Sequence, residues 1–125
     1  MIAKLGLLAL AGALGTLARY GTVVFVERHA TGAFPWPVFT VNMIGCFLFG
    51  FVFAVAEQRA GWSVDTRLIV LTGFMGAFTT FSAFAHNSES LLRESQWVLA
   101  ASNIVAQNVL GVLLLMAGVA AGKLL

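Results

Sequence analysis

The amino-acid sequence predicts an all-α membrane protein with four transmembrane helices. Of its 125 residues, 60% are hydrophobic and only 10% are charged, a balance of apolar surface that a soluble domain of this length could not bury. Four apolar runs also reach the ~20 residues that a helix needs to cross the hydrocarbon core of a bilayer. We expect these spans to form a single domain, residues 1–125, and to cover approximately residues 5–26, 38–56, 68–92 and 98–122.

The first span resembles a signal peptide, because it follows Lys4 and contains several small residues. Three further spans come after it, so cleavage is not needed to explain the hydrophobicity. We therefore expect the first helix to be retained in a multi-pass protein of the cell membrane.

The connectors between the spans have the composition of membrane interfaces. Trp36, Trp62 and Trp97 all fall at predicted span edges, where amphipathic rings are favoured. Ser63 or Asp65 is expected to cap the third helix, since both side chains accept hydrogen bonds from the free N–H groups of a first turn.

The positive charges do not decide the orientation of the spans. The side that holds both termini carries four basic residues, Lys4, Arg59, Arg67 and Lys123. The opposite side carries Arg28 and Arg93, with Arg19 as a third if its long side chain reaches the interface. Two interpretations stay open: both termini are cytoplasmic, or the chain inserts both ways and assembles as an antiparallel pair.

Several classes of function are excluded by what the sequence lacks. Cys46 is the only cysteine, and with two histidines and no Cys/His cluster there is no metal-site signature. The sequence contains no recognisable nucleotide-binding loop and no paired-carboxylate site. We therefore do not expect an enzyme, and the net charge of +2 is no argument for a nucleic-acid partner.

Amide side chains at membrane depth are the first functional candidates, because a polar group in hydrocarbon needs a protein partner or a wet cavity. Asn42 lies near the start of the second span and has two interpretations, a hydrogen bond between helices or a donor that faces a pore. Asn103 and Gln107 are spaced i, i+4 on one face of the last span, with Asn108 beside them. Three amides on one span favour a polar track for a hydrated solute over simple packing.

The third span contains the segment GAFTTFSAF, residues 76–84, in the middle of its apolar run. Gly76 and the Thr79-Thr80 pair, whose hydroxyls compete for backbone hydrogen bonds, favour a break in this helix. A break leaves carbonyl groups that are tolerated only next to protein, water or an ion. The break indicates an ion site, and the alternative is a continuous helix with back-bonded threonines.

The acidic residues all fall near predicted span ends: Glu27, Glu57, Asp65, Glu89 and Glu94. A small multidrug-type four-helix antiporter needs a titratable carboxylate inside the membrane, so the sequence disfavours that class. Amides, hydroxyls and the positive edges of phenyl rings suit a small, hard anion. A third class, a non-transporting membrane assembly subunit, would use the same polar groups only to hold helices together.

The combination of GAFTTFSAF with FTVNMIG, residues 39–45, and with Arg19 in LARY resembles the CrcB/Fluc family of fluoride channels. The resemblance covers all four spans. It implies a passive fluoride-selective channel that exports cytoplasmic fluoride down its electrochemical gradient and so reduces fluoride toxicity. It also implies a bacterial plasma or inner membrane location and an antiparallel, dual-topology homodimer.

The same resemblance implies roles for individual residues. The backbone carbonyls of Gly76 and Thr79 would hold a structural sodium ion at the dimer interface. The fluoride pathway would be lined by residues of three spans: Asn42, Thr80, Phe81, Ser82, Phe84, Asn103 and Gln107.

Two departures from the family pattern affect this pathway. Ala83 stands where the family usually has Thr, and Asn87 stands where a Glu often occurs. His86 has two interpretations, a peripheral wall residue or a proton-linked gate. Arg19 has two as well, an interfacial anchor or a charge that sets the local potential for the anion.

Overall fold

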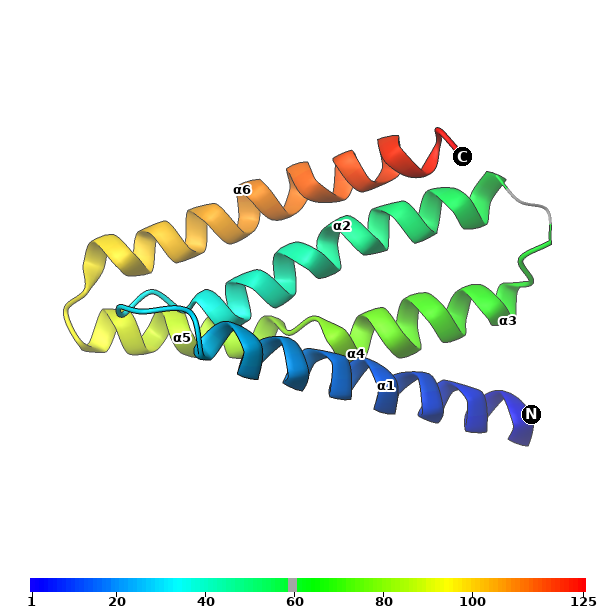
Figure 1. Ribbon diagram of the computed structural model, residues 1–125, viewed down its shortest axis with the longest axis horizontal. Helices are drawn as coiled ribbons and strands as arrows, with labels where there is room; N and C mark the ends of the chain where they lie inside the picture. The colour runs from blue at the N-terminus through cyan, green and yellow to red at the C-terminus, as the bar shows by residue number, and fades with distance from the viewer. Residues whose placement is uncertain (59–60) are drawn as a thin grey trace.

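The computed structural model describes residues 1–58 and 61–125, and this part of the chain is all-helical. Within it, four helical segments are long and apolar enough to cross a membrane: Ile2–Glu27, Trp36–Gln58, Val64–Arg93 and Trp97–Gly122. Both chain termini lie at the same end of the elongated molecule (Figure 1), as an even number of spans requires. The prediction of an all-α protein with four membrane-spanning helices is confirmed. Arg59, counted above among the basic residues, lies outside the described residues.

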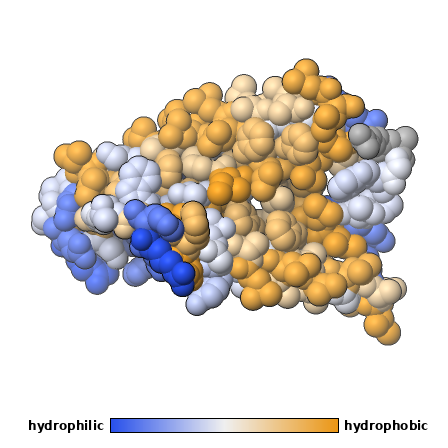
Figure 2. Space-filling view, in the orientation of Figure 1, coloured by the Kyte–Doolittle hydropathy of each residue, from blue (hydrophilic) through white to orange (hydrophobic). Residues whose placement is uncertain are grey.

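The ends of the helices carry the polar residues, and the middle is apolar. Trp36 is the first residue of α2 (Trp36–Gln58), and Trp97 is the first residue of α6 (Trp97–Gly122). Figure 2 shows the hydrophobic surface over the middle of one face, with hydrophilic residues gathered toward the two ends. Because each apolar run is bounded by interfacial residues, the helices have the pattern of membrane spans.

The third span consists of several pieces with different winding. It begins with α3 (Val64–Arg67), which Ser63 caps by accepting a 3.1 Å hydrogen bond from the N–H of Thr66, so the predicted cap is confirmed at Ser63. The π-helix η1 (Leu68–Met75) and the short α4 (Gly76–Phe78) follow. Thr79 and Thr80 are extended, with ψ of 160° and 110°, before α5 (Phe81–Arg93) begins.

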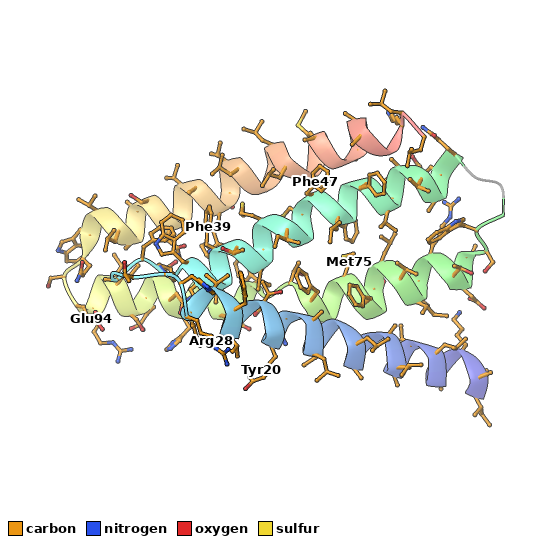
Figure 3. The ribbon with its side chains drawn as sticks, viewed as in Figure 1. Tyr20, Arg28, Phe39, Phe47, Met75 and Glu94 are labelled. Atoms are coloured by element: carbon orange, nitrogen blue, oxygen red, sulfur yellow. The ribbon has the colours of Figure 1, made fainter. Side chains whose placement is uncertain are left out.

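Helices α2 and α6 run side by side (Figure 1) because glycines let their backbones approach closely. A Cβ on Gly118 would lie 2.9 Å from the nitrogen of Phe51, and one on Gly122 would lie 2.6 Å from the carbonyl oxygen of Phe51. Phe47 lies where α2 faces α6 (Figure 3). This pair forms one layer of the molecule.

Helix α1 (Ile2–Glu27) packs along η1 and α4, and here too a glycine lets the backbones approach closely. A Cβ on Gly15 would lie 3.1 Å from both the carbonyl carbon of Phe74 and the Cβ of Ala77. Met75 is buried and lies between this layer and α2 (Figure 3). The extended pair Thr79 and Thr80 is half-buried, within hydrogen-bond reach of side chains on α1 and α2.

Candidate ion pathway

A cavity of about 340 Å³ lies between α2, α6 and the start of α5. Five predicted pathway residues line it: Asn42, Thr80, Phe81, Phe84 and Gln107. They come from three helical segments that are far apart in the sequence. The structure therefore gathers most of the predicted pathway around one space.

Asn42 pairs with the extended backbone of Thr80 as a neighbouring strand would. The N–H of Thr80 donates to Asn42 Oδ1 at 2.9 Å, and Asn42 Nδ2 donates to the carbonyl of Thr80 at 3.1 Å. In a continuous α-helix this N–H would bond to the carbonyl of Gly76, four residues earlier. Asn42 therefore stabilises the extended conformation and leaves the Gly76 carbonyl without that partner.

A chain of side-chain hydrogen bonds continues from Asn42 across α6 to α5. Asn42 Nδ2 also donates to Gln107 Oε1 at 2.8 Å, and Gln107 Nε2 donates to Asn103 Oδ1 at 3.0 Å. Asn103 Nδ2 then donates to the hydroxyl of Ser88 at 2.9 Å, which itself donates to the carbonyl of Phe84 at 2.9 Å. We call the four side chains of Asn42, Gln107, Asn103 and Ser88 the amide relay.

Three of the four side chains of the amide relay are buried although they are polar, and the fourth, Asn42, is half-buried. Asn103 is 0% exposed, Ser88 6% and Gln107 8%. In the described part of the chain, every buried side-chain nitrogen and oxygen has a hydrogen-bond partner. Because an unpaired buried polar group is costly, the relay holds α2, α5 and α6 in one arrangement.

Phe81 and Phe84 form a tilted pair of rings at the start of α5. Their ring centroids are 5.4 Å apart and the ring planes meet at 55°. Phe84 is buried, whereas Phe81 is 78% exposed in the single chain. The neighbouring Phe78 is buried and stacks on Phe74, so it belongs to the packing of the third span.

Arg19 and Ser82 line a second cavity, which lies between α1 and the start of α5. Arg19 Nη1 donates to the carbonyl of Thr79 at 3.3 Å, and Tyr20, which also lines this cavity, points away from the bundle (Figure 3). Thr80 borders both cavities. The guanidinium of Arg19 therefore lies next to the extended residues Thr79 and Thr80.

The acidic side chains lie away from both cavities. Asp65 pairs with Lys4 at 2.5 Å and Glu89 pairs with Arg93 at 2.6 Å, in both cases with exposed carboxylates. Glu27, Glu57 and Glu94 are also exposed, at or next to the ends of helices. The lining of these two cavities thus consists of neutral groups and one arginine.

Comparison with known proteins identifies the family. Residues 6–119 match the family described as CrcB-like protein, Camphor Resistance (CrcB). The chain belongs to the CrcB-like family. Two proteins named Fluoride-specific ion channel FluC are each 50% identical to it: one from Nitrosococcus oceani over 115 residues (92% of each chain), and one from Nitratidesulfovibrio vulgaris over 121 residues (97% of this chain and 98% of the relative). A third of the same name, from Solidesulfovibrio magneticus, is 45% identical over 125 residues, 100% of both chains.

Family membership and the four apolar helices together make the chain a multi-pass membrane protein of bacterial type. The relatives are named as ion channels and not as enzymes. Within the CrcB-like chain, His86 is exposed and lines neither cavity. Asn103 also lines neither cavity and is hydrogen-bonded to Gln107, which does.

Sequence patterns did not single out Ser88 of the CrcB-like chain. Its hydroxyl is buried, yet it follows the polar stretch His86-Asn87 and precedes Glu89, so it reads as part of a solvated helix end. The available signal is its i, i+4 spacing from Phe84, which places both on one helical face. That face packs against α6.

Proposed function

We propose that this chain is a passive fluoride-selective channel that lets cytoplasmic fluoride leave the cell down its electrochemical gradient. The observation that carries the proposal is the cavity in which amide groups and the phenyl rings of Phe81 and Phe84 meet without a carboxylate. The names of the relatives, fluoride-specific ion channels, point to the same ion.

The chemistry of the cavity suits a small anion that must exchange water for other hydrogen-bond donors. Gln107 uses one of its two N–H groups for Asn103, which leaves a second donor on a residue that lines the cavity. Thr80 adds a hydroxyl, and Phe81 and Phe84 add ring edges that carry partial positive charge. We assign the pathway to these groups together with Asn42, Ser82 and Asn103.

A passive channel for fluoride has a simple use. Hydrogen fluoride crosses a bilayer as a neutral molecule and ionises in the less acidic cytoplasm, where the anion is trapped. A selective leak returns the anion to the outside without any energy source. This accords with a pathway that has no carboxylate for proton coupling.

The extended residues Thr79 and Thr80 are the proposed break of the third span, and the functional unit is proposed to be an antiparallel dimer of dual topology. The carbonyls of Gly76 and Thr79 fit a structural sodium ion, because they are oxygen ligands at the C-terminal end of a helix and Asn42 has taken the usual partner of Gly76. Thr79 would share its carbonyl between the ion and Arg19. Reporter fusions at the C-terminus test the topology, and a single observed orientation contradicts it.

Efflux from liposomes tests the function. Vesicles loaded with potassium fluoride should release fluoride when the purified protein and a potassium ionophore are both present, and vesicles loaded with potassium chloride should retain their anion. Absence of fluoride efflux, or chloride efflux at a similar rate, defeats the proposal.

A matched pair of variants links the flux to the cavity. Phe81→Ile removes a ring edge and should lower fluoride efflux about tenfold, the equivalent of about 1.4 kcal/mol. Phe25→Ile, at an exposed ring on α1 that does not line the cavity, should leave efflux unchanged. Equal efflux from both variants removes Phe81 from the pathway.

One observation favours the alternative of a non-transporting assembly subunit: the amides of the relay bond to one another. If they serve only to connect the helices of each subunit, Gln107→Ala should destabilise the subunit and so break up the assembly, which size-exclusion chromatography would show. The channel proposal expects an assembled protein with reduced fluoride efflux.

A further inference from the structure

The amide relay has a defined direction, and the peptide group of Thr80 sets it. A peptide offers one N–H and one carbonyl, so Asn42 must turn its oxygen to the N–H of Thr80 and its nitrogen to the carbonyl. The remaining N–H of Asn42 then requires the oxygen of Gln107, at 2.8 Å. Each later bond follows from the one before it.

The same logic continues to the end of the relay. With its oxygen facing Asn42, Gln107 presents nitrogen to Asn103, and Asn103 presents nitrogen to Ser88. No carboxamide of the amide relay can flip alone, because a flip would place two donors or two acceptors against each other. The orientation of Gln107 therefore depends on both of its neighbours.

Ser88 closes the relay at its far end. Its hydroxyl proton goes to the carbonyl of Phe84, one turn earlier on α5, at 2.9 Å. The oxygen of Ser88 is thus left to accept from Asn103, which is 0% exposed. Without this acceptor, the Nδ2 group of Asn103 would be left unpaired in the interior.

We propose that Ser88 is a positioning residue of the ion pathway. Its hydroxyl fixes the carboxamide of Asn103 and, through Asn103, the carboxamide of Gln107 that lines the cavity. Ser88 itself lines neither cavity and acts only through these neighbours. The proposal rests on the proposed fluoride pathway.

Transport by three variants on α5 tests this role. Ser88→Ala should lower fluoride efflux about tenfold in a protein that still elutes as the wild-type assembly, as expected when a buried donor loses its partner. Ser88→Thr keeps a hydroxyl that can bond to the carbonyl four residues earlier, so its efflux should stay within about twofold of wild type. Ser90→Ala, on the same helix but outside the amide relay, should do the same.

A second readout reports the carboxamides directly. In protein labelled with ¹⁵N at Asn and Gln, the side-chain resonances of Gln107 should shift in Ser88→Ala and stay in place in Ser90→Ala. Unchanged Gln107 resonances, or wild-type efflux from Ser88→Ala, overturn the positioning role. A merely structural serine would lower the thermal stability without moving the resonances of Gln107.

The two proposals fail in different ways. If wild-type protein releases no fluoride, the proposed function is wrong, and the resonances of Gln107 alone decide the role of Ser88. If Ser88→Ala does not fold, the wild-type protein decides: slowly exchanging, separate amide protons on Asn103 and Gln107 support the role, and rapidly averaged ones overturn it.

Discussion

The two halves of the third span are held in place by different forces. The first half, from α3 to α4, is mostly apolar and packs on α1 through close backbone contacts at Gly15 and Gly73. The second half, α5, is tied to α2 and α6 by the amide relay. A close backbone contact leaves no room for an added side chain, so a substitution there forces the two segments apart. Hydrogen bonds, in contrast, can be removed one at a time. Substitutions in the first contact should therefore affect folding, and substitutions in the relay should affect transport.

The largest effect is expected from filling the backbone contact of the first half. Gly15→Val would drive a side chain against the carbonyl of Phe74 and the Cβ of Ala77, and overpacking of this kind costs about 3 kcal/mol. The variant should lose its monodisperse peak in size-exclusion chromatography or unfold at a clearly lower temperature.

A second glycine of α1 provides the control. A Cβ on Gly21 would meet nothing within 4 Å, so Gly21→Val should keep the elution profile and the unfolding temperature of wild type. If the two variants are equally stable, close packing does not hold the first half in place.

An intermediate effect is expected from cutting the relay at its start. Asn42→Leu removes both hydrogen bonds to the Thr80 backbone and the bond to Gln107. Loss of about 2 kcal/mol from unpaired buried groups should lower fluoride efflux by more than about tenfold while the assembly persists. The liposome assay measures this.

Asn108 is the matched control for that variant. It lines the same cavity, but its exposed amide bonds only to the carbonyl of Ile104 on its own helix. Asn108→Leu should therefore keep more of the wild-type efflux than Asn42→Leu. The reverse order would show that contact with the cavity matters more than the pairing with Thr80.

The smallest effect is expected at the boundary between the halves. Arg19→Gln removes a long, 3.3 Å hydrogen bond to the carbonyl of Thr79 and should lower efflux only about fivefold, since such bonds contribute about 1 kcal/mol. Arg28→Gln, at the exposed end of α1, should leave efflux unchanged. Equal efflux from the two variants would leave Arg19 as an anchor without a role at the extended residues.

The sequence predicted those features that depend on local spacing. Apolar run length predicted the four spans, and the i, i+4 spacing of Asn103 and Gln107 predicted a shared face, where the structure joins them at 3.0 Å. The cap of the third span was predicted at Ser63 or Asp65, because capping depends on a few neighbouring residues, and the structure places it at Ser63. Such features need no knowledge of tertiary packing.

Features that depend on distant parts of the chain could not be predicted in this way. Asn42 has two equally plausible environments in the sequence, and only its approach to Thr80, 38 positions away, identifies a clamp on extended backbone. Ser88 looks solvated until α6 is packed against it. The π-winding of η1 also has no local signal, because Leu68–Met75 has the composition of an ordinary apolar helix.

The makeup of the amide relay has a consequence for the energy supply of the cell. Carboxamides neither take up nor release protons at physiological pH, unlike carboxylates or imidazoles. Three of the four side chains in the relay are carboxamides, so the bonded chain from Thr80 to Phe84 is not a proton wire. A bacterium with this path open would gain no proton leak through the relay itself, and each fluoride ion that leaves would carry one negative charge out of the cell.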